Sequence, residues 1–155
     1  MKPQTHPMLM FMRLAALLLA LMPLFASASG PLLLEDRFGR IDAWPAVTVL
    51  GDPGGKLRAG DALAASAKFT VPASAYATLG VHKGVVWIRI PVALSADSGA
   101  DWILDIDYAV INRVDVFVAT DGQLRRHGVL GNLQPVPDNA RGGRAPAVLL
   151  PLKPG

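Results

Sequence analysis

The chain has 155 residues, of which 52% are hydrophobic and 17% charged, with a formal net charge of +3 and no cysteine. This length fits one domain, since single domains most often contain about 100–150 residues. The lack of cysteine excludes disulfides, thiol nucleophiles and thiolate metal sites, and the absence of a long basic block gives no case for nucleic-acid binding.

The N-terminal segment has the three parts of a secretory signal peptide. Lys2 and Arg13 supply positive charge, and the next 12 residues form the apolar run LAALLLALMPLF. Ala26 and Ala28 supply the small residues that a signal peptidase recognises, so cleavage is expected after Ala28. The alternative is an uncleaved membrane anchor, but a spanning helix needs about 20 apolar residues. Without the peptide, 13 basic and 12 acidic residues remain, a net charge of +1.

The part that follows begins with weak local signals. Residues 29–45 are expected to form an N-terminal extended segment, and residues 46–50 a short strand. Asp-Pro-Gly-Gly at residues 52–55 predicts a turn, because Pro presets φ and Gly accepts positive φ. Residues 62–65 give a short helical signal, with Asp61 expected as its N-cap.

The clearest β pattern runs from residue 85 to residue 118. Alternate positions between residues 85 and 94 are apolar, which predicts one strand with a continuous buried face made of Val86, Ile88, Ile90, Val92 and Leu94. The same two-residue period returns at residues 102–108 and 114–118. It predicts two more strands there.

The C-terminal third continues this pattern. Asp121-Gly122 is a pair typical of a type I′ hairpin turn. Residues 123–129 are interrupted by Arg125-Arg126-His127, so an edge strand or a bulge is expected there. Residues 147–152 predict a last strand. The sequence then ends on the turn-like Pro154-Gly155, from which we expect further strands beyond it and a domain truncated at its C-terminus.

These elements together predict an all-β fold. About six strands at spacings near ten residues, each with one apolar face, are typical of an antiparallel β-sandwich or barrel. We assign residues 46–155 to this domain and residues 1–28 to a signal-peptide helix.

Three segments carry a resemblance to a known family: GVVWIR at residues 84–89, WILDI at 102–106 and NRVDVFV at 112–118. They resemble strands of the type 2 extracellular domain of seven-transmembrane receptors with diverse intracellular signalling modules (7TMR-DISM). The resemblance covers about residues 35–155. It implies a jelly-roll β-sandwich similar to carbohydrate-binding modules, exported to the periplasmic face of the bacterial inner membrane.

The resemblance also implies a function. The domain would be a ligand-sensing module that binds an unknown small molecule or glycan, with no catalytic role of its own and no cofactor. A seven-helix membrane domain and an output module, often a histidine kinase or diguanylate cyclase, would follow in the full-length protein.

Residue chemistry alone suggests a ligand-binding face. Aromatic and arginine side chains together suit sugar stacking or carboxylate binding. The candidates are Trp87, Arg89, Trp102, Arg113 and Asp115. The simpler interpretation is that Trp87 fills the core and Arg89 caps a sheet edge.

Two other functions remain open at this point. Asp105 and Asp107 share a strand face at a spacing compatible with a carbohydrate-active hydrolase. If residues 102–108 form a hairpin with the next strand at residues 114–118, a cross-strand ion pair between Asp107 and Arg113 explains the same charge without catalysis. A purely structural interaction domain is the third possibility. His82 and His127 lack partners at metal-binding spacing, so we expect surface histidines and no metal.

Overall fold

The structure is a computed structural model that describes residues 30–74, 78–80, 82–99, 101–136, 138, 140 and 143–153. The expected signal peptide, including Ala26 and Ala28, lies outside the described residues, as do Pro154 and Gly155. In chain order the elements are β1 (Leu32–Leu34), η1 (Trp44–Ala46), β2 (Thr48–Asp52), α2 (Ala59–Ala64), η2 (Ser66–Lys68), β3 (Val85–Arg89), β4 (Val92–Leu94), β5 (Asp101–Asp105), β6 (Val114–Thr120), β7 (Gln123–Leu130) and β8 (Ala147–Pro151).

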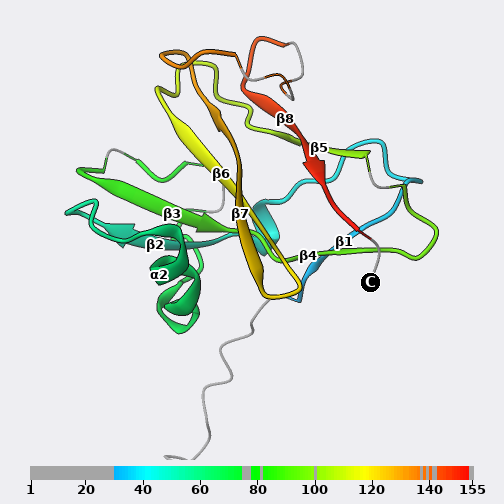
Figure 1. Ribbon diagram of the computed structural model, residues 1–155, viewed down its shortest axis with the longest axis horizontal. Helices are drawn as coiled ribbons and strands as arrows, with labels where there is room; N and C mark the ends of the chain where they lie inside the picture. Colours follow the sequence, from blue (N-terminus) through cyan, green and yellow to red (C-terminus); the bar gives the residue numbers. More distant parts are fainter. Residues whose placement is uncertain are drawn as a thin grey trace, which may run out of the picture.

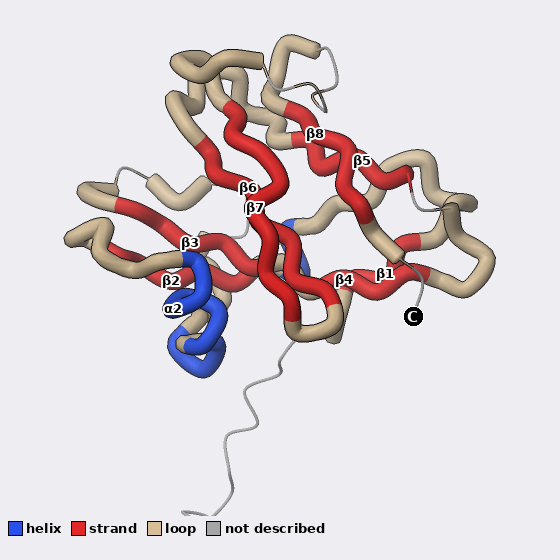
Figure 2. The backbone as a smooth tube through the Cα atoms, viewed as in Figure 1, coloured by secondary structure: helices blue, strands red, loops and turns tan. Residues whose placement is uncertain are grey.

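The strands pair into two-stranded ribbons (Figures 1 and 2). β2–β3, β5–β8 and β6–β7 are antiparallel, whereas β1–β4 is parallel. The β6–β7 hairpin crosses the middle of the view, with α2 beside the β2–β3 ribbon. The prediction of an all-β fold is confirmed. The jelly-roll topology and the likeness to carbohydrate-binding modules stay predictions.

The single strand predicted from residue 85 to residue 94 is two strands. Pro91 has no backbone N–H and cannot continue the ladder, and the chain changes partner there. β3 pairs with β2, whereas β4 pairs with β1. The new pairing begins at Pro91, whose carbonyl oxygen accepts a hydrogen bond from Leu32 N at 2.8 Å. The predicted continuous buried face is therefore wrong as well: Ile88 is 52% exposed and Val92 is 38% exposed.

The β6–β7 hairpin follows the sequence prediction closely. Asp121 and Gly122 have φ values of 51° and 72°, and a type I′ turn requires positive φ at both positions. Val116 pairs with Gly128, but the next residue, Phe117, pairs with Arg126, so one residue of β7 is skipped. His127 is therefore the extra residue of a β-bulge, which confirms the expected interruption.

The hydrophobic core lies between the β6–β7 hairpin and the β5–β8 ribbon. Val116, Leu130 and Val148 are buried there, and Leu104 and Leu150 pack against them. β5 pairs with β8 and not with β6. The expected hairpin between residues 102–108 and 114–118 is therefore wrong, because the partner of β5 lies more than forty residues further along the chain.

The short helix begins differently from the prediction. Asp61 is the third helical residue of α2 and not its N-cap, which is Arg58. The Asp61 carboxylate accepts a hydrogen bond from Arg58 N at 3.0 Å. The acidic side chain thus still satisfies a free backbone donor at the helix start, but from inside the first turn.

Candidate functional site

A charged cluster lies on the side of the β6–β7 hairpin that points away from Val116 and the core. The carboxylate of Asp115 accepts hydrogen bonds from Arg113 Nε at 2.7 Å and Arg113 Nη2 at 3.1 Å, and it also pairs with Arg126 Nη2. The hydrogen bond from Arg113 is the main cause that lowers the pKa of Asp115, against an opposing effect of desolvation. We call these three residues the arginine–aspartate cluster.

An aromatic contact joins the same side of β6 to β3. Phe117 shares a strand face with Asp115, since side chains alternate along a strand, and its ring centroid lies 6.1 Å from that of Trp87. Trp87 is half-buried, and its Nε1 is buried without a hydrogen-bond partner. The fold thus brings Trp87 to the side of the hairpin that carries Asp115.

Asp52 fixes the turn that leads away from the β2–β3 ribbon. It is only 7% exposed, and its carboxylate accepts hydrogen bonds from Lys56 N at 3.1 Å and Leu57 N at 2.9 Å. The bond from Leu57 is the largest cause of the lowered pKa of Asp52. Asp52 pairs with Val85 at one end of the ribbon, two residues before Trp87 on β3. The turn predicted at residues 52–55 therefore packs beside the aromatic contact.

The remaining two candidate residues, Arg89 and Trp102, take no part in the ion pairs of the cluster. Arg89 is exposed on the face of β3 that carries Trp87, at the end of the strand, and its pairing partner is Thr48. Trp102 is paired with Leu150, whose side chain packs into the core with Val116. Because Val116 and Asp115 point to opposite faces of β6, Trp102 lies on the other side of the hairpin. Ligand binding by any of the five residues stays a prediction.

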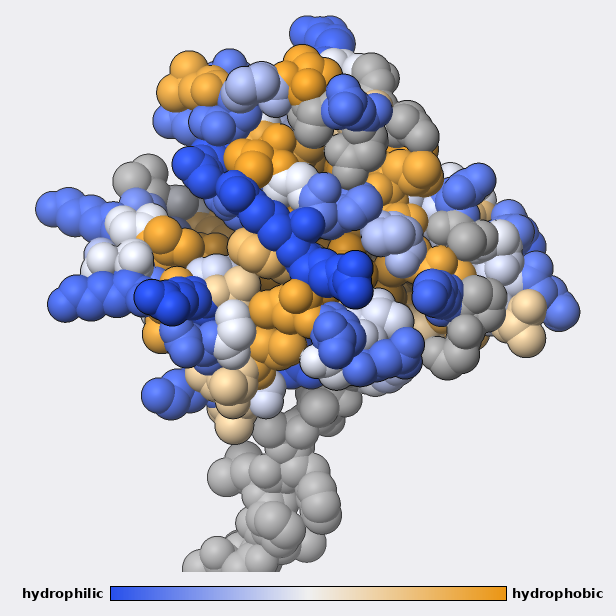
Figure 3. Space-filling view, in the orientation of Figure 1, coloured by the Kyte–Doolittle hydropathy of each residue, from blue (hydrophilic) through white to orange (hydrophobic). Residues whose placement is uncertain are grey.

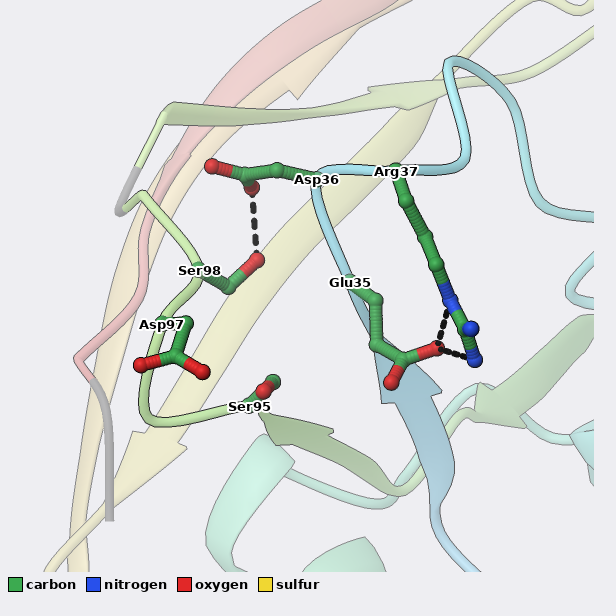
Figure 4. A pocket seen from close by; sticks show the side chains of 6 residues that line it. All are labelled: Glu35, Asp36, Arg37, Ser95, Asp97 and Ser98. Carbon is green, nitrogen blue, oxygen red and sulfur yellow. Dashed lines mark hydrogen bonds and ion pairs between the residues drawn. The ribbon is translucent and has the colours of Figure 1, made fainter.

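A small acidic pocket joins segments that are far apart in sequence (Figure 4). Asp36 accepts hydrogen bonds from Ser98 Oγ at 2.6 Å and Gly99 N at 2.8 Å, and the bond from Ser98 is the main cause that lowers its pKa. Glu35 pairs with Arg37 at 2.7 Å. The pocket has a volume of about 220 Å³ and is lined by Glu35, Asp36, Arg37, Ser95, Asp97 and Ser98.

This pocket was not found from the sequence. Asp36 and Ser98 are 62 residues apart, and neither belongs to a motif. The two donors occupy the carboxylate and tie the loop after β4 to the loop after β1. Within the described ranges no group of three His, Cys, Asp or Glu side chains is placed to hold a metal ion. Loop closure is therefore the role that its contacts support.

The other acidic and histidine candidates do not form a common site. Asp107 pairs with Arg40 at 3.7 Å, with both side chains largely exposed, so the expected pair with Arg113 is wrong. Asp105 ends β5 and is exposed. Neither carboxylate lines the acidic pocket. His82 is exposed, as expected, but His127 is half-buried and donates a ring N–H to Leu149 O.

The short paired strands of the fold define the class of this protein as an all-β domain. The family model described as 7TMR-DISM extracellular 2 matches residues 45–155, and the chain belongs to this family. The resemblance deduced from the sequence is confirmed. Searches of the curated proteins and of the solved structures gave no match. Across the described residues, no helix has the length and apolar character needed to cross a membrane.

The family places the domain within a group of membrane receptors. Its name identifies an extracellular part of seven-transmembrane receptors, so the domain belongs to the sensor side of such a protein and faces away from the cytoplasm.

Proposed function

We propose that this domain senses a small molecule or glycan in the bacterial periplasm and transmits that event to a seven-helix membrane domain of the same receptor. The match of residues 45–155 to the receptor family carries the proposal. In this interpretation residues 1–28 direct export, and residues 46–155 are the sensor domain. The output module is a histidine kinase or diguanylate cyclase on the cytoplasmic side.

The physical requirement for such a sensor is a difference in affinity. A ligand shifts a receptor between two states only if it binds one state more tightly than the other. The ribbons contact each other mainly through side chains such as Trp87 and Phe117, and the charged cluster at Asp115 bridges one hairpin. Contacts of this kind support a sensor whose ribbons shift relative to one another when the ligand binds.

The coding sequence after Gly155 gives the most direct test of the receptor assignment. We expect further β-strands followed by seven apolar segments of about 20 residues each. A reading frame without membrane-spanning segments would contradict the proposal.

A topology reporter tests the location of the domain. Alkaline phosphatase, which folds only after export, is fused after Lys153 and expressed in a bacterial cell. An active fusion is expected, because residues 1–28 would carry it across the membrane. A second fusion at the same position carries a reporter that is active only in the cytoplasm. Activity of this second fusion, together with an inactive phosphatase fusion, would refute a periplasmic sensor.

A further inference from the structure

A groove with a volume of about 480 Å³ lies where the β6–β7 hairpin meets the end of β8. Val116 is in the core, and Val118 and Thr120 continue the same face of β6 toward the hairpin turn. Both of these residues line the groove, as do Pro151, the last residue of β8, and Lys153 just beyond it. The groove therefore begins on the hairpin face at the point where the buried core ends.

Positive charge predominates along this groove. Arg125 and Arg126 line it from β7 and Lys153 from the segment after β8, against the single lining carboxylate of Asp121. Arg126 is paired with Asp115, whereas Arg125 and Lys153 form no ion pair within the part of the chain that the structure describes. Figure 3 shows the band of hydrophilic side chains that crosses the molecule over the β6–β7 hairpin. Two cations are thus available for a ligand.

The walls of the groove are held together by the bulge. His127 is the extra residue on β7, and its ring donates a hydrogen bond to Leu149 O on β8. Asp115 holds Arg126 from the other side of the hairpin. A site whose walls are fixed before binding loses less conformational entropy when a ligand enters.

From this geometry we propose that the groove binds a small organic anion of sugar size that carries a carboxylate or a phosphate ester. Arg125 and Lys153 hold the charged group, since guanidinium and ammonium donors form strong charge-assisted hydrogen bonds with both kinds of oxyanion. Val118 and Pro151 contact the uncharged part of the ligand. The volume lies within the range of about 300–1,000 Å³ that is usual for small-molecule sites.

The proposal rests on the sensor function above and gives it a ligand class. It also differs from the face suggested by residue chemistry alone. Trp87 and Arg89 belong to β3, whereas the groove is formed by the hairpin and β8. In the sequence Arg125 interrupts a strand pattern, and it was not among the five candidates for that face.

Three sugars that differ in one group test the proposal: glucuronate, glucose 6-phosphate and glucose. The purified 155-residue chain is titrated with each by isothermal calorimetry, and the site is located by NMR. Glucuronate or glucose 6-phosphate should bind and shift the amide signals of Val118 and Lys153, and neutral glucose should not. Salt at about 0.5 M should weaken the binding, because the contacts are exposed and charged.

Two variants assign the binding to the groove. Arg125→Gln and Lys153→Gln should each weaken the binding of the anion about tenfold, as expected for loss of one charge-assisted hydrogen bond. Lys68→Gln, on η2 and outside the groove, is the matched control and should bind as the original chain does. Thermal melting of each variant shows whether it is folded, and the second groove variant serves if the first is not.

The inference is overturned if neither anion binds, if glucose binds as tightly as they do, or if both groove variants keep full affinity. Failure there leaves the receptor assignment intact, provided that the gene still encodes seven membrane spans. Conversely, anion binding by a chain without those spans would support the groove and refute the receptor.

Discussion

The rings of Trp87 and Phe117 lie with their centroids 6.1 Å apart and their planes tilted by 43°. Trp87 belongs to β3 and Phe117 to β6, and these two strands share no ladder hydrogen bonds. Aromatic pairs at this separation contribute both buried area and a favourable ring–ring interaction. The contact therefore joins two ribbons that the backbone leaves separate.

Phe117→Ala should lower the free energy of unfolding by about 2 kcal/mol, because a half-buried ring and its contact with Trp87 are both lost. Urea denaturation measures the loss. Tyr108→Ala is the control, since Tyr108 is 59% exposed, and it should change stability by no more than about 0.5 kcal/mol. Equal losses in the two variants would contradict a role for the ring contact.

Asp115→Asn should destabilise the protein in a pH-dependent way. The two arginines lower the pKa of Asp115 from its ordinary 3.8. A folded-state pKa below the unfolded one stabilises the protein above about pH 5, and this stabilisation is lost as the pH falls through the folded pKa. The difference between the two proteins should be about 1 kcal/mol at pH 7, since the partners are half exposed, and it should shrink below pH 3.8.

Unfolding curves across this pH range measure the effect of the Asp115 substitution. Asp101→Asn is the control, because it removes an exposed carboxylate that forms no ion pair among the described residues. Its free energy of unfolding should not show the pH-dependent difference expected for the Asp115 variant. A constant difference between the original chain and the Asp115 variant from neutral to acid pH would count against the paired carboxylate.

Asp52→Ala should cost about 2 kcal/mol of stability, because the backbone N–H groups of Lys56 and Leu57 lose their acceptor in a buried turn. Asp52→Asn keeps one acceptor oxygen and should cost less. Hydrogen exchange at the two amides provides the measurement. Unchanged protection of both amides in the alanine variant would show that other groups hold the turn.

Gly131→Ala should destabilise the end of the β6–β7 hairpin by about 2 kcal/mol or more. Gly131 has a φ of 129°, and a Cβ there would collide with the backbone of Asn112. Gly30→Ala is the control, since a Cβ at that position meets nothing within 4 Å. Thermal melting compares the two variants, and equal melting temperatures would show that the segment near Asn112 adjusts without cost.

Export gives a prediction that depends on the sequence alone. Mass spectrometry of the chain from a periplasmic extract should find Ser29 at the N-terminus. Ala28→Arg should block cleavage, because the peptidase site takes only small residues, and the longer chain should remain with the membrane fraction. A mature chain that still begins at Met1 would favour the uncleaved anchor.

Local chemistry explains which structural predictions were right. The Asp121-Gly122 turn requires only two residues that tolerate positive φ, and the hairpin has that turn. Three basic or aromatic residues in a row interrupted the pattern at Arg125, and a bulge is found there. The turn and the bulge each depend on residues only a few positions apart, so both can be predicted from the sequence.

The errors arose where distant segments compete for the same strand. The sequence shows a proline at position 91, but no neighbouring residue indicates that the segment before it pairs with β2 and the segment after it with β1. The acidic pocket was missed for the same reason, since Asp36 meets Ser98 only after β1 and β4 have paired.

The amino-acid sequence by itself determined the β character of this protein, its hairpin turn and its place in a receptor family, because strand period and turn chemistry are local properties. The tertiary structure alone decided that β5 pairs with β8, that Trp102 lies on the other side of the hairpin from Asp115, and that Arg125 and Lys153 line one groove. Pairing between strands depends on which apolar faces are buried together. That choice depends on the whole chain and not on any single segment.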